Sequence, residues 1–140
     1  MASNRAPLHL TRYVLITGIT GHLLFGVVTL FLPQLIHHYL WPPPLEQVPD
    51  LWLRYDAAVD LALAFSGIYA LLQNNWIAAR TFLFMSGGYV ALLFVVTIVF
   101  LLTVHGRPLM IWLYILLGLL YLPLILVTWR QESARTREDA

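Results

Sequence analysis

Residues 81–104 read TFLFMSGGYVALLFVVTIVFLLTV, a run that contains no charged side chain. A helix needs about 20 apolar residues to cross a hydrocarbon core of about 30 Å, and this run is long enough. Inside a bilayer every backbone N–H and C=O group must be paired within the protein, which helices and closed barrels achieve. Because apolar and polar residues do not alternate along the run, it predicts a transmembrane helix and not a barrel strand.

Three further apolar runs fill most of the remaining chain, at about residues 13–39, 51–73 and 109–129. With residues 81–104 they predict one all-α domain over residues 1–140, an integral membrane bundle of four transmembrane helices. The composition agrees, because 60% of the residues are hydrophobic and 11% are charged, with a mean hydropathy of +0.77. Soluble proteins carry about 25% charged residues. The lipid bilayer is therefore the first expected partner.

The composition also excludes several classes of function. The chain has no cysteine, which excludes disulfides, thiolate metal sites and thiol nucleophiles. Its net charge is +1 and its eight basic residues are arginines scattered along the chain, so nucleic-acid binding is not expected. No catalytic motif is recognisable. We therefore expect a protein that is not an enzyme and that holds no metal.

The arginines also predict the orientation of the chain in the membrane, because short cytoplasmic loops accumulate basic residues. Six arginines flank the side of the membrane that holds both termini, and two lie on the other side: Arg5, Arg12, Arg80, Arg130, Arg135 and Arg137 against Arg54 and Arg107. Both termini are therefore predicted to be cytoplasmic, in a multi-pass protein of the cell's inner (plasma) membrane. The tryptophans form two matching belts, with Trp41, Trp52 and Trp112 outside and Trp76 and Trp129 inside.

A histidine and an aspartate are expected to meet inside the bundle. At about 1.5 Å per residue, His22 and Asp60 lie at similar depths in the first and second predicted helices. Ionisable groups at membrane depth face the interior and usually have a partner, so we predict a buried polar pair. Asp56, one turn from Asp60, is expected to meet water or Arg54. A stripe of small residues beside the acids predicts close helix packing: Ala58, Ala62, Ser66 and Ala70.

Three roles remain open for these polar groups. They can join helices without binding a cofactor, which is the default. His22 can instead be the single axial ligand of a pigment or haem, or can hold a quinone head group together with Asp60 and a tyrosine. Finally, Asp56 and Asp60 can serve a small proton-coupled carrier. Bis-histidine haem is excluded, because three other histidines, His37, His38 and His105, fall near the outer surface, far from His22.

A partner interface is expected at two places. Gly87 and Gly88 give the third predicted helix a site of close approach for a neighbouring subunit. The outer loop carries a stiff triple proline, Pro42, Pro43 and Pro44, which favours an extended path. Two further prolines, Pro33 and Pro123, are expected to kink their helices, and the polar tail 131–140 has a composition that allows disorder.

Parts of the chain resemble the small four-helix bacterial membrane proteins related to DoxX. The resemblance lies in Leu51-Trp52-Leu53-Arg54, in Gly67-Ile68-Tyr69-Ala70-Leu71-Leu72 and in Phe31-Leu32-Pro33. It implies a four-helix bundle and an association with quinone-linked respiratory systems as an accessory subunit. The expected function is therefore that of a non-catalytic accessory or structural subunit of a larger energy-transducing membrane complex, respiratory or photosynthetic. The cofactor-binding protein and the proton-coupled carrier are the alternatives.

Overall fold

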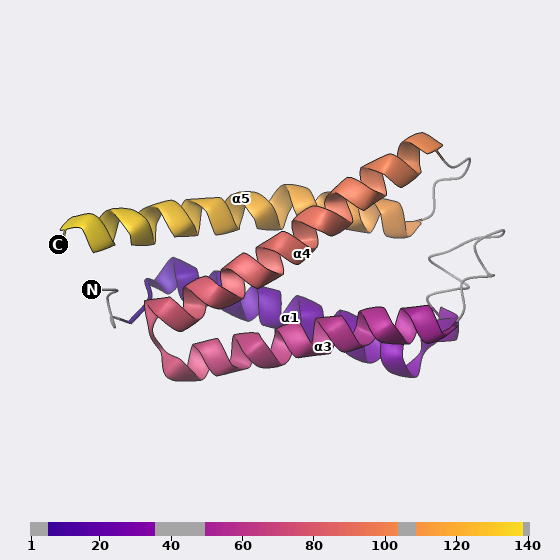
Figure 1. Cartoon of the computed structure of the whole chain (residues 1–140), viewed down its shortest axis with the longest axis horizontal. Coiled ribbons are helices and arrows are strands. Elements are labelled where there is room, and N and C mark those ends of the chain that lie inside the picture. Colours follow the sequence, from indigo (N-terminus) through magenta and orange to yellow (C-terminus); the bar gives the residue numbers. More distant parts are fainter. Residues whose placement is uncertain (1–5, 36–49, 104–108, 139–140) are drawn as a thin grey trace.

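A computed structural model describes residues 6–35, 50–103 and 109–138 of this chain, and its long elements are four helices (Figure 1). They are α1 (His9–Phe31), α3 (Asp50–Gln73), α4 (Trp76–Thr103) and α5 (Leu109–Glu138). All four are long and apolar enough to cross a membrane, which confirms the predicted all-α transmembrane bundle. The start of α1 and the end of α5 lie at one end of the bundle, called here the terminal end (Figure 1). The opposite end is called the distal end.

Proline sets the end of α1, which stops earlier than predicted. The helix begins at His9 and ends at Phe31, and Leu32 leaves the helical conformation with φ −128° and ψ 50°. The cause is Pro33, because a proline disfavours the α conformation in the residue before it. The helix is therefore interrupted at Leu32 and not only kinked, and residues 33–35 are helical again. The predicted continuation over residues 36–39 lies outside the described residues.

Two asparagines make the tight turn between α3 and α4. Asn74 has a φ of 47°, the left-handed conformation that asparagine tolerates just after a helix. Oδ1 of Asn75 accepts a hydrogen bond of 2.9 Å from the backbone N–H of Ala78, as a helix N-cap does. The turn reverses the chain within a few residues, so α3 and α4 lie antiparallel.

The predicted disorder of the polar tail is wrong over the described residues, because α5 continues past Trp129 to Glu138. Pro123 lies inside this helix. The side chain of Glu132 anchors the extension: its Oε1 accepts hydrogen bonds of 2.6 Å from the backbone N–H of Leu8 and from Oγ1 of Thr11. The tail is thus held against the start of α1.

Small residues allow α1 and α3 to pack closely, but of the predicted stripe only Ala70 is buried. Ala58 and Ala62 of the predicted stripe are exposed, whereas Ala57, Ala64 and Gly67 are buried. The buried face contains Asp60, and these positions lie three, four and seven residues from it, on the same side of a helix. Burial of the acid therefore sets the rotation of α3. On α1, a Cβ added to Gly26 would lie 3.1 Å from the carbonyl oxygen of Ala57.

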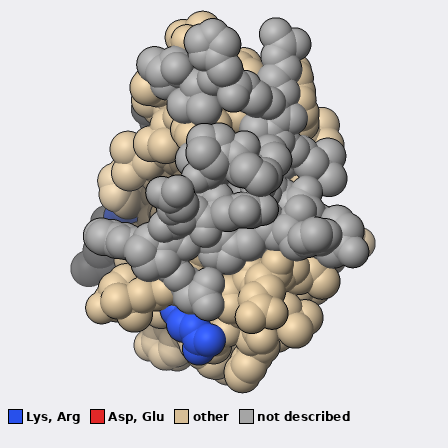
Figure 2. All heavy atoms as spheres, turned by 90° about the vertical axis from the view of Figure 1, so that its right-hand side faces the viewer, with Lys and Arg blue, Asp and Glu red and all other residues tan. Residues whose placement is uncertain are grey.

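The core lies between the helices and the outer surface is apolar, as in a protein surrounded by lipid. The largest fully buried side chains include Phe82, Leu15 and Leu83. Other large apolar side chains, such as Leu102, Leu72 and Phe84, are more than 70% exposed. Figure 2 views the distal end, where the visible described surface is mostly uncharged, with basic atoms at its margin and no acidic atoms.

Candidate functional site

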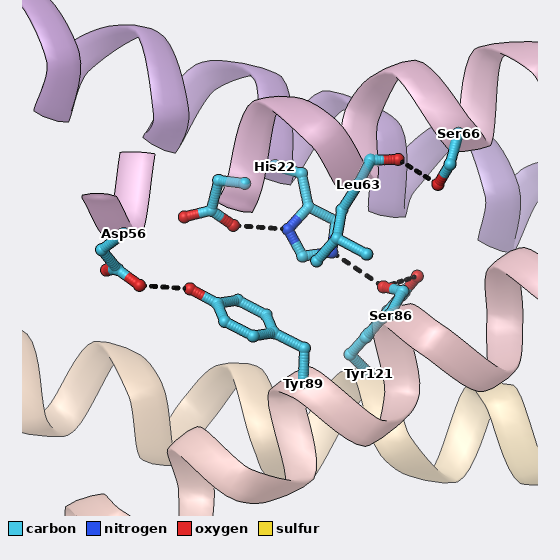
Figure 3. A network of polar contacts seen from close by, with 8 residues as sticks. His22, Asp56, Leu63, Ser66, Ser86, Tyr89 and Tyr121 are labelled. Atoms are coloured by element: carbon cyan, nitrogen blue, oxygen red, sulfur yellow. Dashed lines mark hydrogen bonds and ion pairs between the residues drawn. The ribbon is translucent and has the colours of Figure 1, made fainter. Parts of the chain in front are cut away.

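A buried histidine stands at the centre of the polar site (Figure 3). His22 lies on α1, about 20 Å along the helix from His9, which is close to the middle of a membrane span. Its Nδ1 is 2.6 Å from Oδ1 of Asp60 on α3. The polar pair that the sequence predicts is therefore formed.

The other ring nitrogen of His22 extends the site to the remaining helices. Nε2 is 2.8 Å from Oγ of Ser86 on α4, and this Oγ is 3.2 Å from the hydroxyl of Tyr121 on α5 (Figure 3). One chain of side chains, here called the four-helix chain, thus runs from Asp60 through His22 and Ser86 to Tyr121. It contains one residue from each of the four long helices.

Hydrogen-bond chemistry gives the four-helix chain a direction. An ionised carboxylate can only accept, so with Asp60 ionised the Nδ1–H of His22 donates to it. Nε2 then accepts from the Ser86 hydroxyl, which in turn accepts from the Tyr121 hydroxyl. With Asp60 ionised, every donor of the four-helix chain points toward this carboxylate. The second carboxylate oxygen of Asp60, Oδ2, is buried and has no hydrogen-bond partner within the described part of the chain.

A second acid is paired one helical turn nearer the distal end. The hydroxyl of Tyr89 on α4 donates a hydrogen bond of 2.6 Å to Oδ1 of Asp56. The ring of Tyr89 also lies 5.8 Å from the imidazole of His22, measured between ring centroids. The expectation that Asp56 meets water or Arg54 is corrected here, because α4 crosses close enough to α3 for a tyrosine to reach the acid.

Two glycines make room for these contacts. A Cβ added to Gly18 on α1 would overlap the Tyr121 side chain and would lie 3.2 Å from the ring of Phe82. A Cβ added to Gly67 on α3 would also meet the Phe82 ring, at 2.7 Å. That ring stands edge-on to His22, with ring centroids 6.4 Å apart. The glycines thus allow the aromatic side chains to close over the histidine.

His22 does not fit the role of an axial ligand in this structure. Haem iron or pigment magnesium needs a free imidazole nitrogen, and both nitrogens of His22 contact protein oxygens. A quinone head group fits no better, because it needs hydrogen-bond donors. The hydroxyls of Ser86, Tyr89 and Tyr121 are all engaged with other side chains. The cofactor-binding prediction for His22 is therefore not supported.

The order Asp60, His22, Ser86 is also that of the triad in serine hydrolases, but the surroundings do not suit that chemistry. Ser86 has 0% exposure, and its Oγ already contacts Tyr121. It lies well inside α4, where backbone N–H groups bond to helix carbonyls and do not form an oxyanion hole. The arrangement instead joins helices.

The predicted partner interface is only partly available. Gly87 is buried, and a Cβ added to it would lie 3.2 Å from Cδ1 of Ile125 on α5. Its assignment to a partner interface is therefore corrected, because it serves the packing of α4 on α5. Gly88 is exposed, with no heavy atom within 4 Å of an added Cβ. Three of the interface residues, Pro42, Pro43 and Pro44, and also His37, His38 and His105, lie outside the described residues.

A polar cluster at the terminal end was not foreseen from the sequence. Besides the contacts of Glu132 with Leu8 and Thr11, Nη1 of Arg135 donates to the carbonyl of Ala6 at 3.2 Å. The same Nη1 lies 4.0 Å from Oε2 of Glu132. Glu132 is only 3% exposed. The sequence does not indicate this burial, because the residue lies in a polar tail.

Sequence reasoning also missed Ser86 and Tyr121 as parts of the site. Ser86 looks like one of several small residues on its helix, and Tyr121 like one aromatic residue among many. Their roles depend on how α4 and α5 pack against α1. Within the described residues no three His, Asp or Glu side chains come together as a metal site would require.

Comparison with known proteins assigns neither a family nor a function to this chain. No family model matches the chain, and no curated protein and no solved structure matches it. The likeness to the DoxX-related proteins therefore stays a prediction from sequence, and the function has to be argued from the site.

Proposed function

We propose that this protein is a non-catalytic subunit of a larger membrane assembly, with the four-helix chain as its internal lock. One observation carries the proposal, namely that the members of the four-helix chain are buried and bond to one another. His22, Asp60, Ser86 and Tyr121 are 7%, 3%, 0% and 5% exposed, and each contacts another member of the chain. Burial of these groups and their bonds to one another support a role in holding the helices together.

Large apolar side chains are exposed on all four helices, and the surface proposed here for a partner lies on α4. Large apolar side chains along its distal half are exposed, namely Leu92, Val95, Val96 and Leu102. Gly88 lies on the same helix, and small residues let a second helix approach closely inside a membrane. This supports α4 as the docking face. The resemblance to DoxX-related proteins supports an energy-transducing assembly, respiratory or photosynthetic, as the partner.

The test compares two exposed glycines after purification of the tagged protein from native membranes. Gly88→Leu adds bulk to the proposed interface, and Gly21→Leu adds the same bulk on α1, where an added Cβ also meets nothing within 4 Å. We expect wild type and Gly21→Leu to carry the same partner at fixed stoichiometry and Gly88→Leu to lose it while remaining folded. A wild-type protein that purifies alone would refute the subunit proposal.

A proton-coupled carrier is a second candidate, and a single observation favours it. Oδ2 of Asp60 is buried without a hydrogen-bond partner in the described structure, and unsatisfied ionisable groups within membranes often mark a proton or ion path. Asp56 lies one turn away along α3. The test is proton flux into liposomes that contain the purified protein. Proton flux that the Asp60→Asn substitution abolishes would support the carrier. The absence of flux would rule out the carrier and leave the subunit as the proposed function.

A further inference from the structure

Two arginines at the terminal end have no partner among the residues that the structure describes. Arg80 on α4 and Arg130 on α5 are exposed, and neither forms a hydrogen bond or an ion pair with any residue in the described part of the chain. The other two described arginines at this end differ. Arg12 donates to Oδ1 of Asn74, and Arg135 donates to the carbonyl of Ala6.

A tryptophan pair places both free arginines near the surface of the membrane. Trp76 on α4 and Trp129 on α5 contact each other edge to face, with ring centroids 5.7 Å apart. Tryptophan is enriched at the level of the lipid headgroups. Arg130 follows Trp129 directly, and Arg80 lies one turn, about 6 Å, from Trp76 toward the hydrocarbon. Its long side chain can reach back to the headgroup level.

The free guanidinium groups need an anion from outside the chain. Arginine stays charged, and a charge close to the hydrocarbon is costly unless it is neutralised. Among the acids at this end whose side chains the structure describes, Glu132 is buried and accepts hydrogen bonds from Leu8 and Thr11. A guanidinium fork matches the oxygens of a phosphate group. Lipid phosphates are the anions present at this depth.

We propose that Arg80 and Arg130 bind the headgroups of anionic phospholipids in the leaflet at the terminal end. Phosphatidylglycerol has the required chemistry, a phosphate diester with a net negative charge. Arg54, near the distal end, lies in the other leaflet and serves as a control; it too is exposed and forms no hydrogen bond or ion pair with a described residue. We expect the selectivity for anionic lipid at the terminal end, because two such arginines lie there on two helices that pack against each other.

The experiment measures the relative affinity of the purified full-length protein for spin-labelled phosphatidylglycerol and phosphatidylcholine in phosphatidylcholine vesicles. A basic residue near an anionic surface contributes about fivefold to binding. We expect Arg80→Gln and Arg130→Gln each to lower the preference for phosphatidylglycerol by up to about fivefold, and high salt to weaken it in the wild type.

Three variants serve as controls. Arg80→Lys keeps the charge and should retain most of the preference, while Arg54→Gln should leave it unchanged. Circular dichroism confirms that each variant is folded, which is expected because both arginines are exposed. A wild type without preference for phosphatidylglycerol would overturn the proposal. So would a loss in Arg54→Gln as large as that in Arg80→Gln, because the attraction would then not be specific to the terminal end.

Discussion

At the scale of single residues, the sequence reveals acids and bases but not all of their partners. His22 and Asp60 can be paired in advance, because helix periodicity and depth place both toward the interior. Ser86 and Tyr121 cannot, because their contacts depend on how α4 and α5 cross α1. Gly87 shows the same limit: its small size signals close packing, but only the structure shows that Ile125 occupies the space.

Two glycines on α1 allow a matched test of the packing around His22. Alanine favours a helix over glycine by about 1 kcal/mol, so Gly21→Ala, which faces open space, should be neutral or stabilising. Gly18→Ala should instead destabilise the bundle by about 1–3 kcal/mol, because the added methyl overlaps Tyr121. Reversible unfolding in bicelles measures both. Equal stability of the two variants would show that Tyr121 does not pack against Gly18.

At the scale of the helices, the sequence predicts that the spans exist more securely than where they end. Pro33 is visible in the sequence, but whether a proline kinks or ends a helix depends on its surroundings, and here Leu32 ends it. The extension of α5 cannot be predicted from its polar composition. It is held by contacts with the first turn of α1, more than a hundred residues away in sequence.

Glu132 provides the test at this scale. Glu132→Ala removes the acceptor for the backbone N–H of Leu8 and for the Thr11 hydroxyl, and hydrogen bonds to a charged group contribute about 1.5–3 kcal/mol. We expect lower stability and faster amide hydrogen exchange at Leu8. Glu132→Gln keeps an acceptor oxygen and should lose less. Unchanged exchange at Leu8 in the alanine variant would mean that the end of α5 does not hold the start of α1.

At the scale of the whole molecule, hydropathy alone predicts the four-helix membrane fold, because length and apolar composition suffice to identify a span. The way in which the spans assemble does not follow from hydropathy. In lipid, apolar side chains such as Leu72 and Leu102 favour no particular neighbour, so small residues and buried polar groups decide which helix faces meet. The clearest example is α3, because burial of Asp60 sets the rotation of this helix and leaves Ala58 exposed.

The orientation of the molecule in its membrane stays a prediction from arginine placement. Six arginines on the side of the termini and two on the other predict a cytoplasmic terminal end. Topology reporters fused at Asn75 and Ala140 should therefore report the cytoplasm, and a reporter at Gln47 the outside. A cytoplasmic signal at Gln47 would show that the predicted orientation in the membrane is wrong.

The central claim is that the four-helix chain holds the bundle together, and the contact between His22 on α1 and Ser86 on α4 tests it most directly. The measurement is a double-mutant cycle of His22→Ala and Ser86→Ala, followed by unfolding in bicelles. Polar contacts between membrane helices contribute about 0.6 kcal/mol on average and about 1.7 kcal/mol at most, and we predict a coupling free energy within this range. Strictly additive losses would contradict the claim, because they would show that the two side chains do not stabilise each other.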